Sequence, residues 1–209
     1  KFGNKNPLFL SVQGALPFGK VVNIGLNDFT VRELGKDINN NRHAYNAYSR
    51  FIQSYSSVVC DLPSEFFDEM TKQYMVARNH ASFNDFTALD WMQLTKLYKG
   101  IYIHFTGKPF PQDPFEQLRT AIQTCFNINT SVAGQRINAR VCSSLTSYVV
   151  VSRTYFGVSA GRSCSAIFNT HDLETGEEKI NGIFADNSDI NDVKLGYIPV
   201  EDGSAMKDK

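Results

Sequence analysis

The sequence contains no long apolar run, and this absence excludes a membrane protein of the helical kind. A helix that crosses a bilayer needs about 20 consecutive apolar residues. The apolar runs of this chain contain only a few residues each. We therefore predict that the protein has no membrane partner.

The sequence also has no excess of charge of either sign. Lysine and arginine together number 21, and aspartate and glutamate also number 21. Proteins that bind nucleic acid or an acidic membrane surface carry a basic patch or a positive balance. The composition therefore predicts no nucleic-acid partner.

Cysteine is scarce, and its spacing excludes a zinc site of the usual kind. None of the four cysteines belongs to a C-x-x-C pair, and no histidine lies at zinc-ligand spacing beside them. We predict buried free thiols at Cys60, Cys125, Cys142 and Cys164, and no metal site. Free thiols persist in reducing compartments, so we expect an intracellular protein, in the cytoplasm or an organelle. Because the chain begins with Lys1, we expect it to be part of a longer or processed polypeptide.

Apolar residues are nevertheless frequent enough to build a core. The chain is 42% hydrophobic and 12% aromatic, which suits one large or two small domains. Hydrophobic spacing divides it into three parts. Residues 1–27 include a short strand at 7–12, residues 28–140 have helical periodicity, and residues 141–209 resemble strands separated by turns. The predicted fold class is α/β.

Start and turn signals place the elements within these parts. Thr30 with Glu33, and Thr87 with Asp90, have the spacing of capping boxes. Asp113 precedes a proline and predicts the N-cap of another helix. Aromatic residues recur along these helices and are expected in the core. The last part predicts strands at 147–156, 165–168 and 179–184, with a turn at 174–177.

A glycine-rich stretch has the pattern of a phosphate-binding loop but differs from it in detail. Residues 14–20 spell G-x-x-x-x-G-K after a candidate strand. The next residue is Val21 and not the serine or threonine that holds magnesium. Two β-branched valines also open a helix poorly. The stretch is therefore not expected to be a true phosphate loop, and Lys20 remains a candidate nucleotide contact.

Several strings resemble those of a known family, the pyruvate, phosphate dikinases. Residues 107–118, GKPFPQDPFEQL, match the family's G-K-x-F-P-x-D-P-x-E-Q-L, and residues 23–28, NIGLND, resemble its N-L-G-L-N-D. Residues 41–53 resemble its N-x-R-F-A-Y-D-x-Y-R-R-F-I-Q. Residues 166–193 resemble G-V-A-F-T-R-N-P-x-T-G-E and the stretch that follows it. The order of the strings agrees over most of the chain.

The resemblance implies an ATP-grasp-like fold, incomplete in this chain, with a helical insertion subdomain. Residues 1–27 would begin the nucleotide-binding lobe, residues 28–140 would form the helical subdomain, and residues 141–209 would form a β-rich part with a polar tail. In that family this domain binds ATP between two α/β lobes and passes phosphate to a histidine on another domain. The full enzyme interconverts ATP, phosphate and pyruvate with AMP, pyrophosphate and phosphoenolpyruvate. The implied cofactors are ATP and magnesium.

Positions that carry charge in the family are altered here. The arginine of S-V-R-S-G is Gln13, and an amide supplies neither the positive charge nor the fork of a guanidinium. The metal-binding acid of Y-G-E is Ile183. The glutamine and glutamate of A-Q-G-E-D-V are Asp189 and Asn191.

Two further positions depart from the family, and the alignment leaves an alternative open. The cation of F-T-R is at best His171, after an apparent one-residue insertion, and the methionine that would contact adenine is Thr154. A shift of the alignment by one residue would make Asp186, Asp189 or Asp192 metal ligands.

These losses favour a protein without catalytic activity, because phosphoryl transfer needs cations on the phosphates and carboxylates on magnesium. We expect a pseudoenzyme with no catalytic residue and no bound cofactor. It would be a structural or scaffolding subunit that contacts other protein subunits through residues 41–126. The alternative is the ATP-binding domain of a divergent dikinase that makes phosphoenolpyruvate from pyruvate and ATP. A third hypothesis is a regulatory module that binds nucleotide without turnover. Candidate surface anchors are Tyr45, Phe83, Phe86, Trp91 and Tyr98, and the alternative for each of them is a place in the core.

Overall fold

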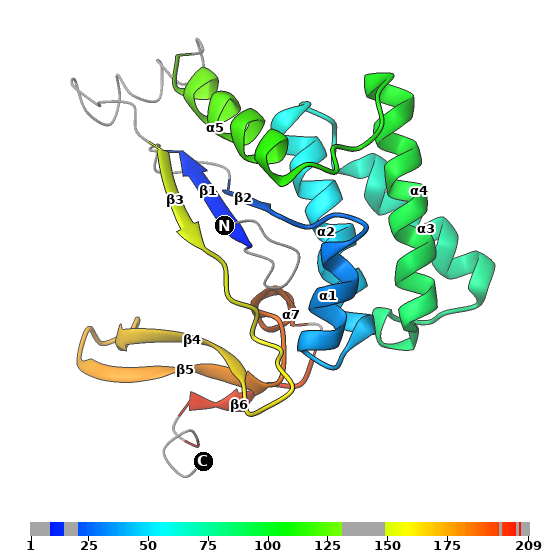
Figure 1. Cartoon of the computed structure of the whole chain (residues 1–209). Coiled ribbons are helices and arrows are strands. Elements are labelled where there is room, and N and C mark those ends of the chain that lie inside the picture. Colours follow the sequence, from blue (N-terminus) through cyan, green and yellow to red (C-terminus); the bar gives the residue numbers. More distant parts are fainter. Residues whose placement is uncertain (1–8, 15–20, 131–148, 197, 204, 206–209) are drawn as a thin grey trace. The chain divides into compact units, whose positions relative to one another are not determined.

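The computed structural model describes residues 9–14, 21–130, 149–196, 198–203 and 205. The chain divides into two compact units, one formed by residues 1–36 and 41–154 and the other by residues 37–40 and 155–209 (Figure 1). Both units combine helices with antiparallel strands, which confirms the α/β class. None of the described helices is long and apolar enough to span a bilayer.

The first unit contains a three-stranded sheet with the order β2-β1-β3. Its strands are β1, Leu10–Gly14, β2, Val21–Ile24, and β3, Val149–Arg153. Both pairings with β1 are antiparallel. The predicted strands at 7–12 and 147–156 therefore exist, although the first part of the former lies outside the described residues.

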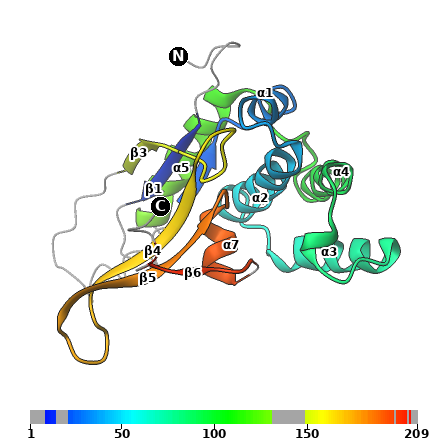
Figure 2. The same ribbon diagram turned by 90° about the horizontal axis from the view of Figure 1, so that it is seen from below.

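Among the described residues, five α-helices lie between β2 and β3 in the chain. They are α1, Thr30–Asp37, α2, Asn41–Val59, α3, Glu65–Arg78, α4, Ala88–Thr106, and α5, Pro114–Thr130, with a short 3-10 helix, η1, at Phe83–Asp85. Helix α4 packs against both α2 and α3 (Figure 2). The helical periodicity of the middle part is thereby confirmed up to residue 130, and residues 131–140 lie outside the described residues.

The predicted helix starts are confirmed at two of three places. Thr87 and Asp90 form a reciprocal capping box at α4, and Asp113 accepts a 3.0 Å hydrogen bond from the backbone N–H of Phe115 at α5. The prediction for Thr30 is wrong. Its hydroxyl donates to the Gly25 carbonyl at 2.7 Å, and Asn27 accepts from the first backbone N–H groups of α1 instead.

The core of the helical region is aromatic, as the sequence predicts. Phe110 lies edge-on to Phe51, Tyr55 and Tyr102, with ring centroids 5.5, 5.4 and 5.2 Å away. Burial raises the pKa of Tyr55 to about 12, because the charged phenolate would lose its hydration there. These rings therefore pack as neutral apolar surfaces.

Three of the five aromatic residues expected at the surface belong to this core. Phe86, Trp91 and Tyr98 are only 1%, 5% and 4% exposed. The prediction that they anchor a partner is wrong, because each ring is enclosed between helices of its own unit. Tyr45 and Phe83 are partly exposed.

The junction between α3 and α4 is held by a buried carboxylate. Asp90 accepts hydrogen bonds from the Tyr74 hydroxyl and from the backbone N–H of Thr87, at 3.0 and 2.9 Å. Burial by itself raises the pKa of Asp90, but these hydrogen bonds outweigh it and hold the pKa well below its usual range. The carboxylate therefore stays charged throughout the neutral range.

Gln117 joins the two ends of the helical region. Its side-chain oxygen accepts from the Gly25 backbone N–H at 2.9 Å. Its side-chain nitrogen donates to the carbonyls of Leu26 and Pro111, at 2.9 and 2.8 Å. Gln117 is fully buried, and Gly25 has a φ of 105°, which favours glycine. The loop before α1 is therefore fixed to α5 through a single amide.

The second unit is built on a long β-hairpin. It contains β4, Cys164–His171, β5, Glu178–Asp186, helix α7, Ile190–Leu195, and β6, Glu201–Asp202. The sheet order is β4-β5-β6, and the register shifts between Asn169 and His171. The predicted strands and the turn between them are confirmed.

Replacing Gln117 with leucine should destabilise the protein strongly. Leucine fills the space but leaves one N–H and two carbonyl groups of the backbone without their partner, so we expect a loss of about 3 kcal/mol in the free energy of unfolding. Urea denaturation measures this quantity. Gln123→Leu, at an exposed position of the same helix, should change it by less than about 0.5 kcal/mol. Equal effects of the two variants would contradict the role of the buried amide.

Replacing Asp113 with alanine should remove the N-cap of α5. We expect a loss of about 1 kcal/mol, because the backbone N–H of Phe115 loses its acceptor. Asp113→Ser keeps a side-chain oxygen at the cap and should retain most of the stability. Thermal unfolding of the three proteins decides the matter, and a serine variant as unstable as the alanine variant would argue against capping.

Candidate functional site

Gln13 lies on the exposed face of the first sheet. Its directly opposite residues are Val21 on β2 and Val150 on β3. Gln13 is exposed, and the two valines are 45% and 48% exposed. The side chain predicted to replace the family's arginine is therefore a neutral amide open to solvent.

The opposite face of this sheet explains why Gln13 points outward. Val12 and Val22 are directly opposite each other and fully buried. Gly14 lies on the same face as Val12, and a Cβ atom there would meet that of Cys125 on α5 at 3.6 Å. Because side chains alternate along a strand, packing of α5 on this face fixes Gln13 on the other.

A row of small polar side chains crosses the same exposed face. Ser11 is directly opposite Asn23 on β2 and Ser152 on β3. Directly opposite side chains start about 5 Å apart, so the three groups form a short uncharged band beside Gln13. The band offers hydrogen bonds but no fixed charge.

The remaining candidates of the first unit are placed only in part. Thr154 follows β3, and its backbone N–H donates to the Phe9 carbonyl at 2.9 Å. Its hydroxyl is buried and has no hydrogen-bond partner among the described residues. Lys20 lies outside the described residues. Val21 begins a strand and not the helix that a phosphate loop requires, so the rejection of that motif is confirmed.

In the second unit, one face of the hairpin brings several candidate positions together. Ile183 is directly opposite Ile167 on β4 and Asp202 on β6, and Asn181 is directly opposite Asn169. These five side chains share one face, because directly opposite residues point the same way. The face thus carries two amides, two aliphatic groups and one carboxylate.

His171 lies at the far end of the same strand as Asn169. It is exposed, and one ring nitrogen lies 3.0 Å from the Thr170 hydroxyl. It is directly opposite Glu178, beyond the irregularity in the pairing. The next turn is closed by Asp172, whose pKa is lowered by backbone N–H groups of Thr175 and Glu174. His171, the candidate cation, is therefore directly opposite one acid, Glu178.

Sequence reasoning missed Asp202 because the family pattern does not reach it. The carboxylate lies on this face because β6 pairs with β5. The paired residues Ile183 and Asp202 are about 20 positions apart in the chain. The position of β6 is fixed by two glycines, since a Cβ atom at Gly182 or Gly203 would meet the Phe168 ring at 2.6 or 2.4 Å. No local pattern in the sequence predicts that pairing.

The acids that a shifted alignment would make metal ligands lie at the end of β5 and in or next to α7. Asp186 ends β5 and Asp192 lies in α7. The carbonyl of Asp189 accepts from the backbone N–H of Asp192 at 3.0 Å at the start of α7. Asn191 lies in α7, and its side chain is outside the described set. Among the described residues, no three histidine, cysteine or acidic side chains are grouped to hold a metal ion.

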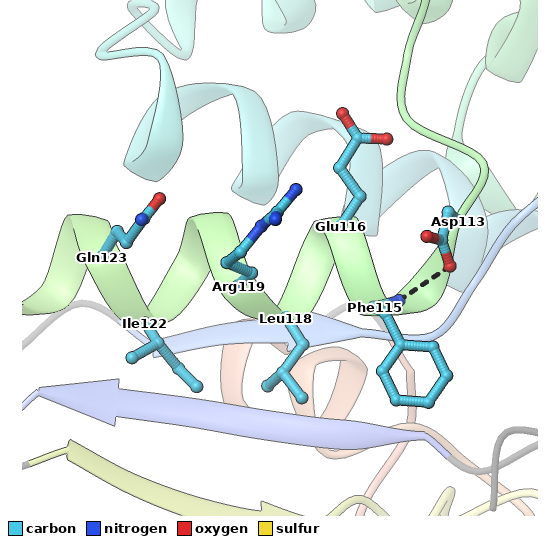
Figure 3. Close-up of a pocket in the computed structure, with 7 residues that line it drawn as sticks. All are labelled: Asp113, Phe115, Glu116, Leu118, Arg119, Ile122 and Gln123. Carbon is cyan, nitrogen blue, oxygen red and sulfur yellow. Dashed lines mark hydrogen bonds between the residues drawn. The ribbon is translucent and has the colours of Figure 1, made fainter.

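A hollow of about 490 Å³ lies along α5, and its lining residues include none of these candidates (Figure 3). Phe115, Leu118 and Ile122 project from one side of the helix. Glu116 and Arg119 project from the other side. Among the described residues, the hollow is lined by α5 and its N-cap.

The cysteines are free thiols in the part of the chain that the structure describes. Cys125 is buried, and Cys60 and Cys164 are partly exposed. Burial raises the pKa of both the Cys60 and Cys125 thiols. They are therefore poor nucleophiles. Cys142 lies outside the described residues.

Comparison with known proteins identifies the relatives of the chain. It is 32% identical over 97% of its length to pyruvate, phosphate dikinase 1, chloroplastic, of Oryza sativa subsp. japonica. It is 31% identical over 98% of its length to pyruvate, phosphate dikinase 2 of Zea mays, and 32% identical over 93% to the pyruvate, phosphate dikinase of Rhizobium meliloti (strain 1021). The chain is a homologue of the N-terminal region of pyruvate, phosphate dikinases.

The homology covers only part of each relative. The chain spans 22%, 24% and 23% of the length of these three proteins. No protein-family model matches the chain. The relatives include chloroplastic and bacterial proteins.

Proposed function

We propose that this chain is the ATP-binding region of a divergent pyruvate, phosphate dikinase, with an incomplete ATP-grasp-like fold. The observation that carries the proposal is similarity to these enzymes along almost the whole chain, at 32% identity. The substrates of the complete protein would be pyruvate, phosphate and ATP. Its reaction would be transfer of phosphoryl groups to make phosphoenolpyruvate.

Two sheet faces offer groups that suit a nucleotide. In the first unit, Gln13 and Ser11 offer amide and hydroxyl groups on an exposed face. In the second, Asn169, Asn181 and Asp202 offer oxygen atoms. Magnesium prefers oxygen ligands and is commonly held by one or two carboxylates together with phosphate oxygens. The donor set of the second unit therefore fits a magnesium–nucleotide complex in which the nucleotide supplies most of the ligands.

The altered positions predict weak binding and slow chemistry. Magnesium, when bound, would neutralise charge on the phosphates, and the protein would have to supply the remaining positive charge. Gln13 contributes a hydrogen-bond donor without charge, and Ile183 contributes no ligand at all. We therefore expect an affinity for ATP far below that of a site with arginine and glutamate at these places.

A second candidate is a non-catalytic structural or scaffolding subunit. The observation that favours it is the neutral chemistry of Gln13 and Ile183 on the two sheet faces. Such a protein would contact other subunits through residues 41–126. In that region Phe66 on α3 and Phe105 on α4 are 46% and 45% exposed, with their ring centroids 4.7 Å apart. Exposed aromatic pairs of this kind are common anchors of interfaces.

Calorimetric titration of the whole protein with ATP and magnesium tests the proposal. We expect a dissociation constant of about 1 mM, equivalent to about −4 kcal/mol. Absence of binding at about 10 mM ATP would instead support the scaffolding candidate. If ATP binds, assays for pyruvate-dependent formation of AMP and phosphoenolpyruvate separate an enzyme from a regulatory module that binds nucleotide without turnover.

Substitution of Gln13 with arginine should strengthen ATP binding. A guanidinium at this exposed position adds positive charge and a fork that suits phosphate, so we expect an affinity about tenfold higher, or 1.4 kcal/mol. Gln123→Arg adds the same charge at an exposed position of α5 and should leave the affinity unchanged. An equal gain in both variants would show a general effect of charge and not a site at Gln13.

A further inference from the structure

We propose that Asp202 supplies the metal-binding carboxylate of the nucleotide site, one strand away from Ile183. The proposal rests on the proposed function, because it concerns the metal that accompanies ATP. Asp202 lies on β6, directly opposite Ile183 on β5. A carboxylate lost from the middle strand would thereby be replaced by one on the neighbouring strand.

The pairing of β6 determines where this carboxylate lies. Directly opposite residues on antiparallel strands have Cβ atoms about 5 Å apart and point to the same face. The Cβ atom of Asp202 therefore lies about 5 Å from that of residue 183, and both side chains point to the same face. Its neighbour Glu201 is directly opposite Phe184 and points to the other face.

The register of β6 is constrained by close packing. Gly203 lies so near Phe168 that a Cβ atom would come within 2.4 Å of the ring and 3.1 Å of the Gly182 carbonyl. A slip of one residue would bring the larger side chain of Asp202 to that place and turn Glu201 to the face of Ile183. The glycine therefore holds Asp202, and not Glu201, on the candidate face.

The neighbours of Asp202 complete a set of oxygen donors. Asn181 lies two residues from Ile183 on the same face of β5, and Asn169 is directly opposite Asn181. A diagonal pair such as Asn181 and Asp202 is about 7–8 Å apart, a span that a hydrated magnesium ion with phosphate ligands can bridge. Both asparagines are partly exposed, and Asp202 is exposed, so the donors are accessible to a ligand.

The experiment measures how much a metal ion strengthens ATP binding. The whole protein is titrated with ATP in the presence of Mn²⁺, as a probe for Mg²⁺, and again with a chelator and no metal. The quantity of interest is the ratio of the two affinities. For the protein without substitutions, we expect ATP to bind at least about tenfold more tightly with the metal than without it. This ratio corresponds to about 1.4 kcal/mol. Protein-bound Mn²⁺ is followed in parallel by electron paramagnetic resonance.

Asp202→Asn should bring the ratio close to one while leaving the metal-free affinity for ATP unchanged. Glu201→Gln removes the same charge one residue away, from the opposite face, and should keep the ratio of the original protein. Adding Ile183→Glu to Asp202→Asn should restore the ratio, because the new carboxylate lies directly across from the lost one.

The outcomes separate this inference from the function on which it rests. An Asp202→Asn variant that keeps the full metal effect overturns the assignment, as does an equal loss in Glu201→Gln. ATP binding without any metal effect in the original protein also overturns it, while leaving the proposed function intact. Absence of ATP binding under both conditions would overturn the proposed function and this inference with it.

Discussion

The hydrogen bonds of one buried amide hold together the parts of the first unit that surround its sheet. Gln117 on α5 contacts the backbone of Gly25, Leu26 and Pro111. Each buried backbone group left without a hydrogen-bond partner lowers the stability by about 1–3 kcal/mol. Gln117 therefore stabilises the buried position of the loop before α1. Helix α5 in turn covers the sheet at Gly14 through Cys125. The outward direction of Gln13 thus depends, through α5, on the hydrogen bonds of Gln117.

Around this amide, the strings that resemble the dikinases have a structural explanation. The Asn27 side-chain amide donates to the Gln112 backbone carbonyl, and the Asp28 backbone N–H donates to the Gln112 side-chain oxygen, at 2.9 Å each. Asp28 also forms a 2.7 Å ion pair with Lys99, and the Tyr48 hydroxyl lies 3.1 Å from its carboxylate. A partly exposed ion pair contributes little by itself, but the network fixes the relative positions of α1, α2, α4 and α5. Strings such as NIGLND and GKPFPQDPFEQL therefore make the fold, whether or not the protein turns over ATP.

The site positions obey a different constraint from these structural residues. Gln13 and Ile183 lie on strands whose opposite faces carry buried side chains, Val12 and Phe184. A strand position tolerates exchange of a charged for a neutral side chain when that side chain is not part of the core. The fold can therefore survive exchange of the side chains at Gln13 and Ile183. The same sheet geometry places the Asp202 carboxylate directly opposite Ile183.

The sequence by itself determined the elements that depend on interactions between nearby residues. Helical periodicity, the capping pattern at Thr87 and the proline after Asp113 each act within a few residues, and each prediction from them is confirmed. The resemblance identified the family from contiguous strings. Thr30 was assigned wrongly because its hydroxyl bonds to Gly25 instead of capping the helix. Phe86, Trp91 and Tyr98 were assigned wrongly because helical spacing does not show which face meets another helix.

Tertiary structure alone decided what lies beside each site position. The pairing of Asp202 with Ile183 depends on the contact of Gly182 and Gly203 with Phe168. The burial of Gln117 depends on three backbone groups from two other segments. Such contacts join residues that are distant in the chain, and their energies depend on packing and not on local spacing. For this reason the sequence could point to Gln13 and Ile183 as candidate positions. Only the folded chain shows that Gln117 helps to position Gln13 and that Asp202 lies directly opposite Ile183.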